Sequence, residues 1–242
     1  MPPHAPFYAV GDVHGQLSEL ERALARIEAD GGPEARIVFL GDLVDRGPDS
    51  RGVLDRLIAG IEAGRPWTVV KGNHDEMFER FLTLNTLDHH RIVSGVNWFA
   101  DRLGGQATLR SYGVDPAAHP TAEALLFAAR EAVPAGHLHF LQSLPRWHHV
   151  EGFLFVHAGI RPGVPWPEQD PEDFLWIRQP FLDHPEPFPW LVVHGHTPGK
   201  RPVRHANRVN LDGGAGHGRA LVPAVFEGGD AWLLEESGRV AF

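Results

Sequence analysis

Short β-prone runs alternate with helical patterns through the first 72 residues, and this alternation constrains the fold more than any other feature. The runs cover residues 7–10, 36–40 and 67–70, and a glycine follows each within two residues. Between them, apolar side chains recur at helical spacing over residues 17–27 and 53–61. Strand–helix–strand units of this kind place parallel strands side by side. The sequence therefore predicts an α/β fold.

The middle of the chain has a different pattern. Residues from about 76 to 150 carry apolar pairs at helical spacing, with glycine and proline between them. We predict a helical cap insertion that lies over one end of the sheet. Residues 161–190 are rich in proline and aromatic side chains, which favours an ordered loop with one short helix.

Strands return in the second half of the chain. Residues 152–156 and 191–193 are apolar runs typical of buried strands. Short runs separated by glycine pairs then predict an antiparallel meander that forms a second sheet. These runs are residues 208–211, 220–226 and 231–234. A length of 242 residues fits one domain, over residues 1–242, that contains the insertion.

Composition limits the partners and the compartment. Lys and Arg number 22 against 31 Asp and Glu, for a net charge of −9, so we expect no stable nucleic-acid binding through phosphate contacts. No apolar stretch approaches the roughly 18 residues of a membrane span. The N-terminus lacks the basic and apolar regions of a signal peptide, so we expect a cytoplasmic protein. With no cysteine and 16 histidines, any transition-metal site would use imidazole and oxygen ligands.

Polar residues of metal-ligand type follow five of the predicted strands. Carboxyl ends of strands are where ligands bind in α/β sheets, so we expect these segments to meet at one edge. They are Gly11-Asp12-Val13-His14-Gly15, Gly41-Asp42-Leu43-Val44-Asp45-Arg46-Gly47, Gly72-Asn73-His74-Asp75, His157-Ala158-Gly159-Ile160 and His194-Gly195-His196-Thr197.

The spacing within these segments favours a pair of metal ions. Asp12 and His14 are two residues apart, so in extended backbone both side chains point to one side and can hold one ion. Asp42 can bridge to a second ion, which Asn73, His157 and His196 would complete. Oxygen and imidazole donors suit manganese, iron or zinc. Two such ions form a clamp for in-line attack at phosphorus.

In this combination the motifs resemble those of the phosphoprotein phosphatase family, within the calcineurin-like metallophosphoesterase superfamily. The resemblance runs from about residue 7 to about residue 215. It implies a β-sandwich of two mixed sheets flanked by helices, with a dinuclear metal centre at one edge. It also implies an enzyme, a hydrolase of phosphoesters. Lys71-Gly72-Asn73-His74-Asp75 departs from the Arg-Gly-Asn-His-Glu typical of the eukaryotic members. The chain is more similar to small bacterial members.

The resemblance implies roles for individual residues. Asp12, His14 and Asp42 would hold the first metal, and Asp42, Asn73, His157 and His196 the second. Manganese is the expected metal, and a hydroxide between the two ions would attack phosphorus.

Four further residues would act on the substrate. His74 would protonate the leaving oxygen, and Asp45 would orient His74. Arg46 and Arg178 would clamp the phosphate, because a planar guanidinium binds two oxygens at once.

Three functions are compatible with these residues. Our first hypothesis is hydrolysis of phosphoserine or phosphothreonine in proteins. The alternative is a symmetrical bis(5'-nucleosyl)-tetraphosphate hydrolase. The bases of its substrate could stack on aromatic residues, unless those residues form the core of the cap. A catalytically inactive module that binds phosphorylated partners ranks last, because no matched ligand position is damaged. The candidate stacking residues are Trp98, Tyr112, Trp147 and Trp166.

The remaining histidines have weaker signals. We expect His194 to be a structural histidine rather than a third ligand, and His217 to lie near the pocket with its role open. The pairs at residues 89–90 and 148–149 lack any motif context, so we expect solvated or capping side chains there.

Overall fold

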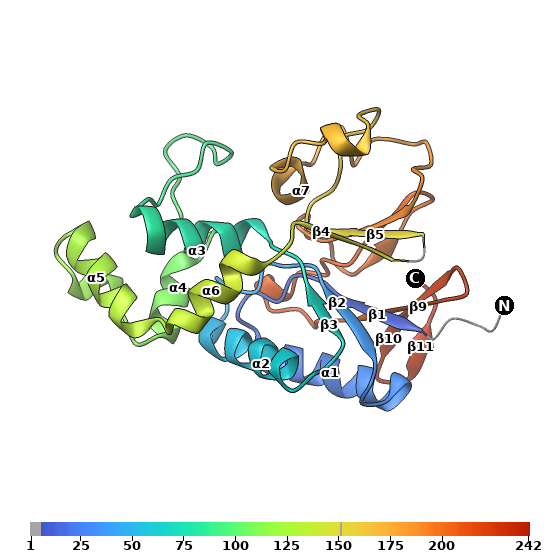
Figure 1. Cartoon of the computed structure of the whole chain (residues 1–242), viewed down its shortest axis with the longest axis horizontal. Coiled ribbons are helices and arrows are strands. Elements are labelled where there is room, and N and C mark those ends of the chain that lie inside the picture. Colours follow the sequence, from blue (N-terminus) through green and yellow to red (C-terminus); the bar gives the residue numbers. More distant parts are fainter. Residues whose placement is uncertain (1–5, 151) are drawn as a thin grey trace.

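The computed structural model describes residues 6–150 and 152–242, and it is built around two β-sheets that face each other (Figure 1). The expectation of no signal peptide falls partly on residues 1–5, outside the described part. No described helix is both long and apolar enough to cross a bilayer. The cytoplasmic location and the single domain over residues 1–242 stay predictions.

The first sheet combines the predicted parallel strands with the C-terminal strands. Its order is β11-β10-β9-β1-β2-β3. The strands β1, β2 and β3 pair parallel, and β9, β10 and β11 each pair antiparallel with their neighbours. The strands are β1 (Phe7–Val10), β2 (Arg36–Phe39), β3 (Trp67–Val69), β9 (Ala224–Glu227), β10 (Asp230–Glu235) and β11 (Gly238–Val240).

The prediction that three C-terminal runs form one antiparallel meander in a second sheet is wrong for two of the runs. Residues 208–211 do contain a strand of the second sheet, whereas the other two runs form a meander with β11 in the first. There β9 pairs antiparallel with β1, with Phe226 opposite Phe7. This register stacks the two rings at 5.3 Å between the sheets. Burial of such aromatic side chains explains why the meander extends the first sheet.

The second sheet is formed mainly by the middle of the chain, in the order β4-β5-β6-β8-β7. Strands β5, β6 and β8 run parallel, and β4 and β7 flank them antiparallel. Its strands are β4 (Trp147–Val150), β5 (Phe153–Val156), β6 (Leu191–His194), β7 (Val203–Arg204) and β8 (Arg208–Asn210). Both sheets are mixed, which confirms the predicted sandwich class.

Alternation along β1 separates the two cores of the molecule. Phe7 and Ala9 point into the core between the sheets, where they meet Phe155. Tyr8 and Val10 point the other way, into a larger apolar cluster under the helices. Every side chain of β1 faces one of these two buried cores, which explains why the strand is apolar along its whole length.

Two long helices cover the outer face of the first sheet. The helix α1 (Leu17–Gly31) ends before Gly32, and α2 (Ser50–Glu62) begins after Asp49, whose carboxylate accepts from the Gly52 N–H. Both match the periodic segments of the sequence.

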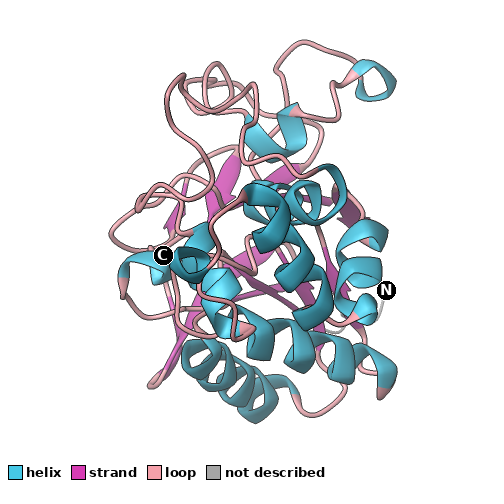
Figure 2. Ribbon diagram, turned by 90° about the vertical axis from the view of Figure 1, so that its left-hand side faces the viewer, coloured by secondary structure: helices cyan, strands magenta, loops and turns pink. Residues whose placement is uncertain are grey.

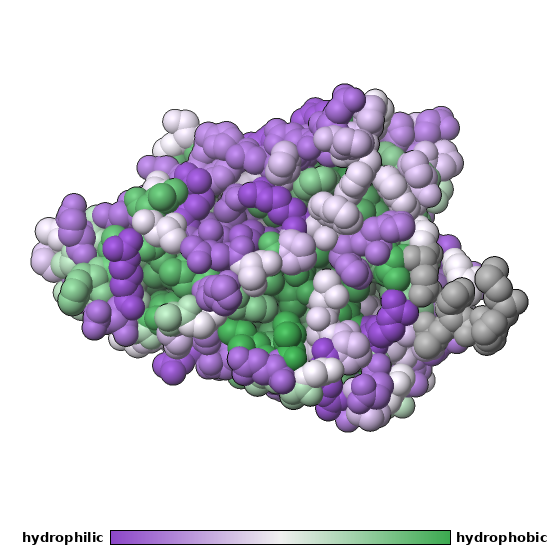
Figure 3. Space-filling view, in the orientation of Figure 1, coloured by the Kyte–Doolittle hydropathy of each residue, from purple (hydrophilic) through white to green (hydrophobic). Residues whose placement is uncertain are grey.

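A helical cap, formed by α3 to α6 and the turns between them, covers one end of the sandwich, and Figure 2 shows these helices in front of the strand ends. Its elements are α3 (Asn73–Leu84), α4 (Gly105–Ser111), η1 (Pro116–Ala118), α5 (Ala122–Ala132) and α6 (Ala135–Ser143). Apolar side chains reach the surface over the cap and towards α2 (Figure 3). The predicted limit at residue 150 is wrong, because residues 147–150 form β4.

Segment 157–190 packs over the outer face of the second sheet. It contains η2 (Trp166–Glu168) and the short α7 (Asp173–Trp176). Phe174, Ile177 and Phe181 bury against Leu154 and Val192 of the sheet. The segment is therefore an ordered covering with one short α-helix, as predicted.

Candidate functional site

The predicted ligands come together at the carboxyl ends of strands from both sheets. Asp12, Asp42 and Asn73 follow β1, β2 and β3, whereas His157 and His196 follow β5 and β6. All five side chains, and that of His14, are buried. The site thus lies at the edge where both sheets end.

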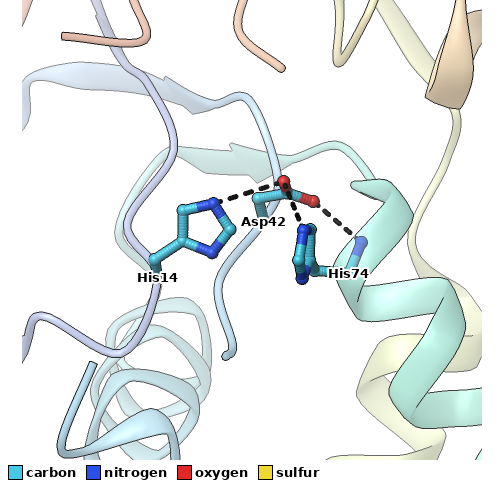
Figure 4. Close-up of side chains that lie close together, drawn as sticks. All are labelled: His14, Asp42 and His74. Carbon is cyan, nitrogen blue, oxygen red and sulfur yellow. Dashed lines mark hydrogen bonds and ion pairs between the residues drawn. The ribbon is translucent and has the colours of Figure 1, made fainter. Parts of the chain in front are cut away.

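Asp42 is the centre of this cluster. In the part of the chain that the structure describes, two ligand groups within 4.8 Å share it: His14, Asp42 and His74, and Asp42, His157 and His196. Figure 4 shows the rings of His14 and His74 both pointing at one carboxylate oxygen of Asp42, which is Oδ2. Asp42 Oδ2 lies 3.5 Å from His14 Nε2, and Oδ1 lies 3.4 Å from His157 Nε2. One carboxylate therefore faces two groups of ligands.

The first group is held in place by the backbone. His14 Nδ1 donates to the Val44 carbonyl at 2.9 Å, which directs Nε2 towards the centre. Asp12 Oδ2 lies 4.0 Å from that Nε2, and the Asp12 carboxylate accepts from the His196 N–H at 3.1 Å. Asp12 therefore joins the first group to the second.

The second group brings ring nitrogens of two histidines close to the side-chain oxygen of Asn73. His157 Nδ1 donates to the Leu40 carbonyl at 2.8 Å, and burial lowers the pKa of His157 to about 4, so Nε2 of this neutral imidazole carries no proton. That Nε2 lies 2.9 Å from Asn73 Oδ1 and 3.2 Å from His196 Nδ1. His157 Nε2 and Asn73 Oδ1 are both acceptors, so either an N–H at His196 Nδ1, which lies 2.8 Å from that oxygen, or a bound cation would stabilise them.

Two further observations test whether a metal fits here. His196 Nε2 is buried without a hydrogen-bond partner. At Gly195, an added Cβ would lie 1.9 Å from Asp12 Oδ1, so only glycine lets this carboxylate approach the loop. The donor set is imidazole, carboxylate and amide oxygen, which suits manganese, iron or zinc. The residues fit a divalent cation.

The electrostatics of the cluster favour positive charge. Burial raises the pKa of Asp12 well above its ordinary value, and repulsion from Asp212 and Asp42 adds to the shift. Burial raises the pKa of Asp42 as well, and it lowers the pKa of His196. A bound cation would stabilise the ionised form of these carboxylates, and the neutral imidazoles could bind it as ligands.

The backbone of the site adopts unusual conformations. Among the described residues, six other than glycine have a positive φ, and five of them belong to the predicted motifs. Such conformations cost on the order of 1–3 kcal/mol each and persist where the surroundings fix them. The five are His14, Asp42, Asp45, Arg46 and His196.

His74 forms a pair with Asp45. His74 Nδ1 donates to Asp45 Oδ2 at 2.6 Å, which leaves Nε2 facing the centre. The cap supplies the other partners of Asp45, since Trp98 Nε1 donates at 2.7 Å and Thr108 Oγ1 at 2.6 Å. Burial raises the pKa of Asp45 to about 7 and lowers that of His74 to about 3. Hydrogen bonds from Thr108 and Trp98 oppose the rise and favour the carboxylate form of Asp45.

Four arginines line the cavity over the cluster. It has a volume of about 390 Å³, and the acids among the described residues that line it are Asp12 and Asp42. Arg46 donates to His14 Nε2 at 2.6 Å and to His74 Nε2 at 3.1 Å, and Arg178 donates to the His196 carbonyl at 3.2 Å. The other two arginines are Arg91 and Arg102.

The sequence analysis missed several residues that the site uses. Asp75 accepts from the N–H groups of Gly72 at 2.8 Å and Leu43 at 2.9 Å, so it connects two ligand loops. Its place at the third position of α3 could have indicated this. Asp212, buried beside Asp12, gave no signal, because nothing in its local sequence marks it.

Two of the proposed base-stacking residues are unavailable. Trp98 is fully buried and Tyr112 nearly so, both within the core of the cap. Trp147 and Trp166 pack edge to face at 4.9 Å and do not line the cavity. Trp176, which the sequence analysis did not select, does line it.

Histidines outside the cluster differ in their burial and in their partners. His89 is not solvated, because it is buried, stacks on Trp176 at 4.6 Å and lies 3.3 Å from the Glu76 carboxylate. It does cap the backbone, the other expectation, since Nδ1 accepts from the Arg91 N–H at 3.2 Å. His194 is buried with both ring nitrogens engaged, at Gly195 and Arg208, as a structural histidine would be. His217 is exposed and lines a second, adjacent cavity.

Comparison with known proteins gives a consistent result. A family model described as calcineurin-like phosphoesterase matches residues 5–218. A bis(5'-nucleosyl)-tetraphosphatase, symmetrical, of Ralstonia nicotianae is 35% identical over 162 residues, which cover 67% of this chain and 43% of that protein. The chain thus spans less than half the length of this relative.

Two further similarities cover more of both chains. A bis(5'-nucleosyl)-tetraphosphatase PrpE, of the asymmetrical type, from Anoxybacillus flavithermus is 26% identical over 88% of this chain and 86% of its own. The crystal structure of a putative diadenosine tetraphosphatase superposes with a TM-score of 0.64 at 22% identity, covering 95% of this chain and 92% of its own. The structural match supports the fold.

Proposed function

The chain belongs to the calcineurin-like phosphoesterase family, and we propose that it hydrolyses bis(5'-nucleosyl) tetraphosphates with the help of two divalent metal ions. The observation that carries the proposal is a cavity lined by Arg46, Arg102 and Arg178, none of which has a carboxylate partner among the described residues, in a chain of net charge −9. Arg91 also lines the cavity, but it is already paired with Glu172 and Asp173. Positive charge concentrated at one site of an acidic protein favours a substrate with several phosphates.

We assign two metal positions, as the resemblance implies. The first geometric group contains His74, but we place Asp12 there instead, because Asp12 Oδ2 lies 4.0 Å from His14 Nε2 and His74 is bonded to Asp45. Asp12, His14 and Asp42 would hold one ion, and Asp42, Asn73, His157 and His196 the other. When bound, the ions supply positive charge for the phosphate oxygens and lower the pKa of water that attacks phosphorus. Manganese is our first choice.

The arginines bind and orient the phosphate chain. Arg46 reaches the middle of the site, between His14 and His74, so its guanidinium can take two oxygens of the reacting phosphate. Arg178 faces that phosphate from the side of His196. Neither arginine has a carboxylate partner among the described residues, so both are free to neutralise substrate.

His74 and Asp45 handle the proton. The attacking oxygen forms a bond to phosphorus, the bridging P–O bond breaks, and the leaving phosphate oxygen can take a proton from His74 Nε2. Burial lowers the pKa of His74 and its Nδ1 donates to Asp45, so the neutral ring carries its one proton on Nδ1. Nε2 must therefore gain a proton before it can give one, and the attacking water, which loses a proton, can supply it. An anionic phosphate beside the ring would favour this protonated form by raising its pKa. The Asp45 carboxylate fixes the ring through Nδ1 and stabilises its protonated form.

This proposal reverses the order of our sequence hypotheses. We had placed phosphoserine and phosphothreonine proteins first, and the relatives reported above carry tetraphosphatase names instead. A single phosphomonoester, held by Arg46 and Arg178, also leaves Arg102 without a role. The nucleotide alternative therefore becomes the proposal.

A comparison of rates tests it. Purified manganese-loaded protein is given diadenosine tetraphosphate and, separately, a phosphoserine peptide, and kcat/KM is measured for both. We expect the dinucleotide to be preferred by at least about 100-fold, which equals about 2.7 kcal/mol. A preference for the peptide would reject the proposed substrate and retain a phosphoesterase. The Asp42→Asn variant controls for contaminating enzymes.

A further inference from the structure

A second cavity adjoins the first and shares two of its arginines. It has a volume of about 340 Å³ and lies between α4 and the turn η3 (Ala215–His217). Arg46 and Arg102 line both cavities, so the two meet at these side chains. The second cavity holds no predicted metal ligand.

The shared boundary is fixed by the backbone on both sides of Arg46. Its N–H donates to the Gly104 carbonyl at 3.2 Å, and its Nε donates to the Arg102 carbonyl at 3.2 Å. From the other side, Gly216 packs so closely that an added Cβ would lie 2.5 Å from His14 Cδ2 and 3.1 Å from Arg46 Cδ. Arg46 and the residues around it therefore form a defined boundary between the two cavities.

The second cavity is also positively charged. Arg46, Arg102 and Arg110 line it against one acid, Asp101, although Arg110 also lies 3.6 Å from Asp115 outside the cavity. The guanidinium of Arg102 has no hydrogen-bond or ion-pair partner among the described residues. An unpaired guanidinium between two connected cavities suits a phosphate that passes from one to the other.

An aromatic surface completes the cavity. The Phe99 ring lines it and is half-buried, packed 5.4 Å from Trp98 in the core of the cap. Its backbone is anchored, since its carbonyl accepts from Gln106 Nε2 at 3.0 Å. A ring held in this way offers a purine base an apolar contact.

We infer that the second cavity is the subsite for one nucleoside diphosphate arm of the substrate. This inference rests on the proposed function. Cleavage in the middle of a tetraphosphate places the central phosphates at the metal centre and sends one nucleotide to each side. The first cavity, with Trp176, takes one arm. Arg102 and Arg110 bind the phosphates of the other, and Phe99 contacts its base. A phosphomonoester needs no such second cavity.

The test changes residues that line only the second cavity. Arg110 and His217 are exposed, and neither belongs to the metal cluster or to the cavity above it. The double variant Arg110→Gln/His217→Asn is compared with wild type and with Arg22→Gln. Arg22 is an exposed arginine on α1 whose ion-pair partner is Glu19. Melting temperatures verify that all three proteins are folded.

ADP binding to manganese-loaded protein, measured by calorimetry, is the first readout. We expect wild type and Arg22→Gln to bind two ADP molecules, one in each cavity, and the double variant to bind one of the two about tenfold more weakly. Hydrolysis of nitrophenyl phosphate should stay within twofold of wild type, and KM for diadenosine tetraphosphate should rise about tenfold. Unchanged ADP affinity would overturn the subsite. Failure of wild type to cleave the dinucleotide would instead reject the proposed function, and the ADP titration would still decide the subsite.

Discussion

The indole N–H of Trp98, inside the helical cap, donates to the Asp45 carboxylate at 2.7 Å, and Asp45 in turn holds His74. The cap therefore determines the orientation of the histidine in the active site. Trp98 is itself held by packing within the cap, since its ring lies 5.2 Å from that of Phe81 on α3.

Loss of this hydrogen bond should impair turnover. Trp98→Phe keeps an aromatic side chain in the cap and removes the N–H, and hydrogen bonds to charged groups contribute about 1.5–3 kcal/mol. We expect kcat to fall between about 10-fold and 100-fold. Phe81→Leu is the matched control, which should lower the melting temperature and keep kcat. Equal kcat in Trp98→Phe and wild type would contradict the coupling.

The role of His74 as an acid can be tested with leaving groups. His74→Asn should preserve metal binding but slow hydrolysis most for substrates whose leaving oxygen is strongly basic, such as alkyl phosphates. Nitrophenyl phosphate, whose leaving group needs little protonation, should lose much less. Rates for the two classes, measured with manganese saturating, give the comparison. An equal loss for both would argue against proton donation by His74.

Asp42 should control both metal positions. Asp42→Asn removes the shared carboxylate charge, so we expect no measurable hydrolysis and weaker binding at both positions. Wild type at manganese concentrations 100-fold above Kd should gain about 2.7 kcal/mol of stability over EDTA-treated protein. For a chain of this size that corresponds to a melting temperature higher by about 5–10 °C. Full activity or an unchanged manganese shift in Asp42→Asn would refute the shared ligand.

Acid stability depends on an interaction far from the site. Arg239 donates to Asp30 at 2.8 Å, and these hydrogen bonds lower the pKa of Asp30 below 3.8. A lowered carboxylate pKa stabilises the fold above the unfolded-state pKa, and the contribution is lost as pH falls through the folded-state pKa. Asp30→Asn should therefore melt below wild type at pH 7, with a smaller difference at pH 3. The same difference at both values would contradict this.

Local sequence predicted the elements whose patterns are local. The periodicity of α1, the apolar runs of β1 and β2 and the polar segments behind them all follow from short windows. Asp12 and His14 do converge, with Asp12 Oδ2 4.0 Å from His14 Nε2, but not through the extended backbone that the sequence analysis assumed, because His14 has a positive φ. The motif at residues 41–47 also contains Asp42 and Arg46, both of which have a positive φ, so the strained backbone lies within a predicted segment.

Features that depend on distant pairing were not predictable. Nothing in residues 224–240 indicates that β9 should join β1 rather than the second sheet, because sheet membership is decided by partners more than 200 residues away. Burial of His89 depends on Trp176 and Glu76, which come from separate elements. The role of Trp98 was likewise invisible, since its partner Asp45 lies 53 residues earlier.

Product analysis tests the central claim most directly. Manganese-loaded protein is incubated with diadenosine tetraphosphate, and the nucleotides are separated by chromatography during the first tenth of the reaction. An active centre with one nucleotide arm in each cavity predicts ADP as the sole product. The appearance of ATP with AMP, or no cleavage by a protein that hydrolyses a phosphoserine peptide, would contradict the account.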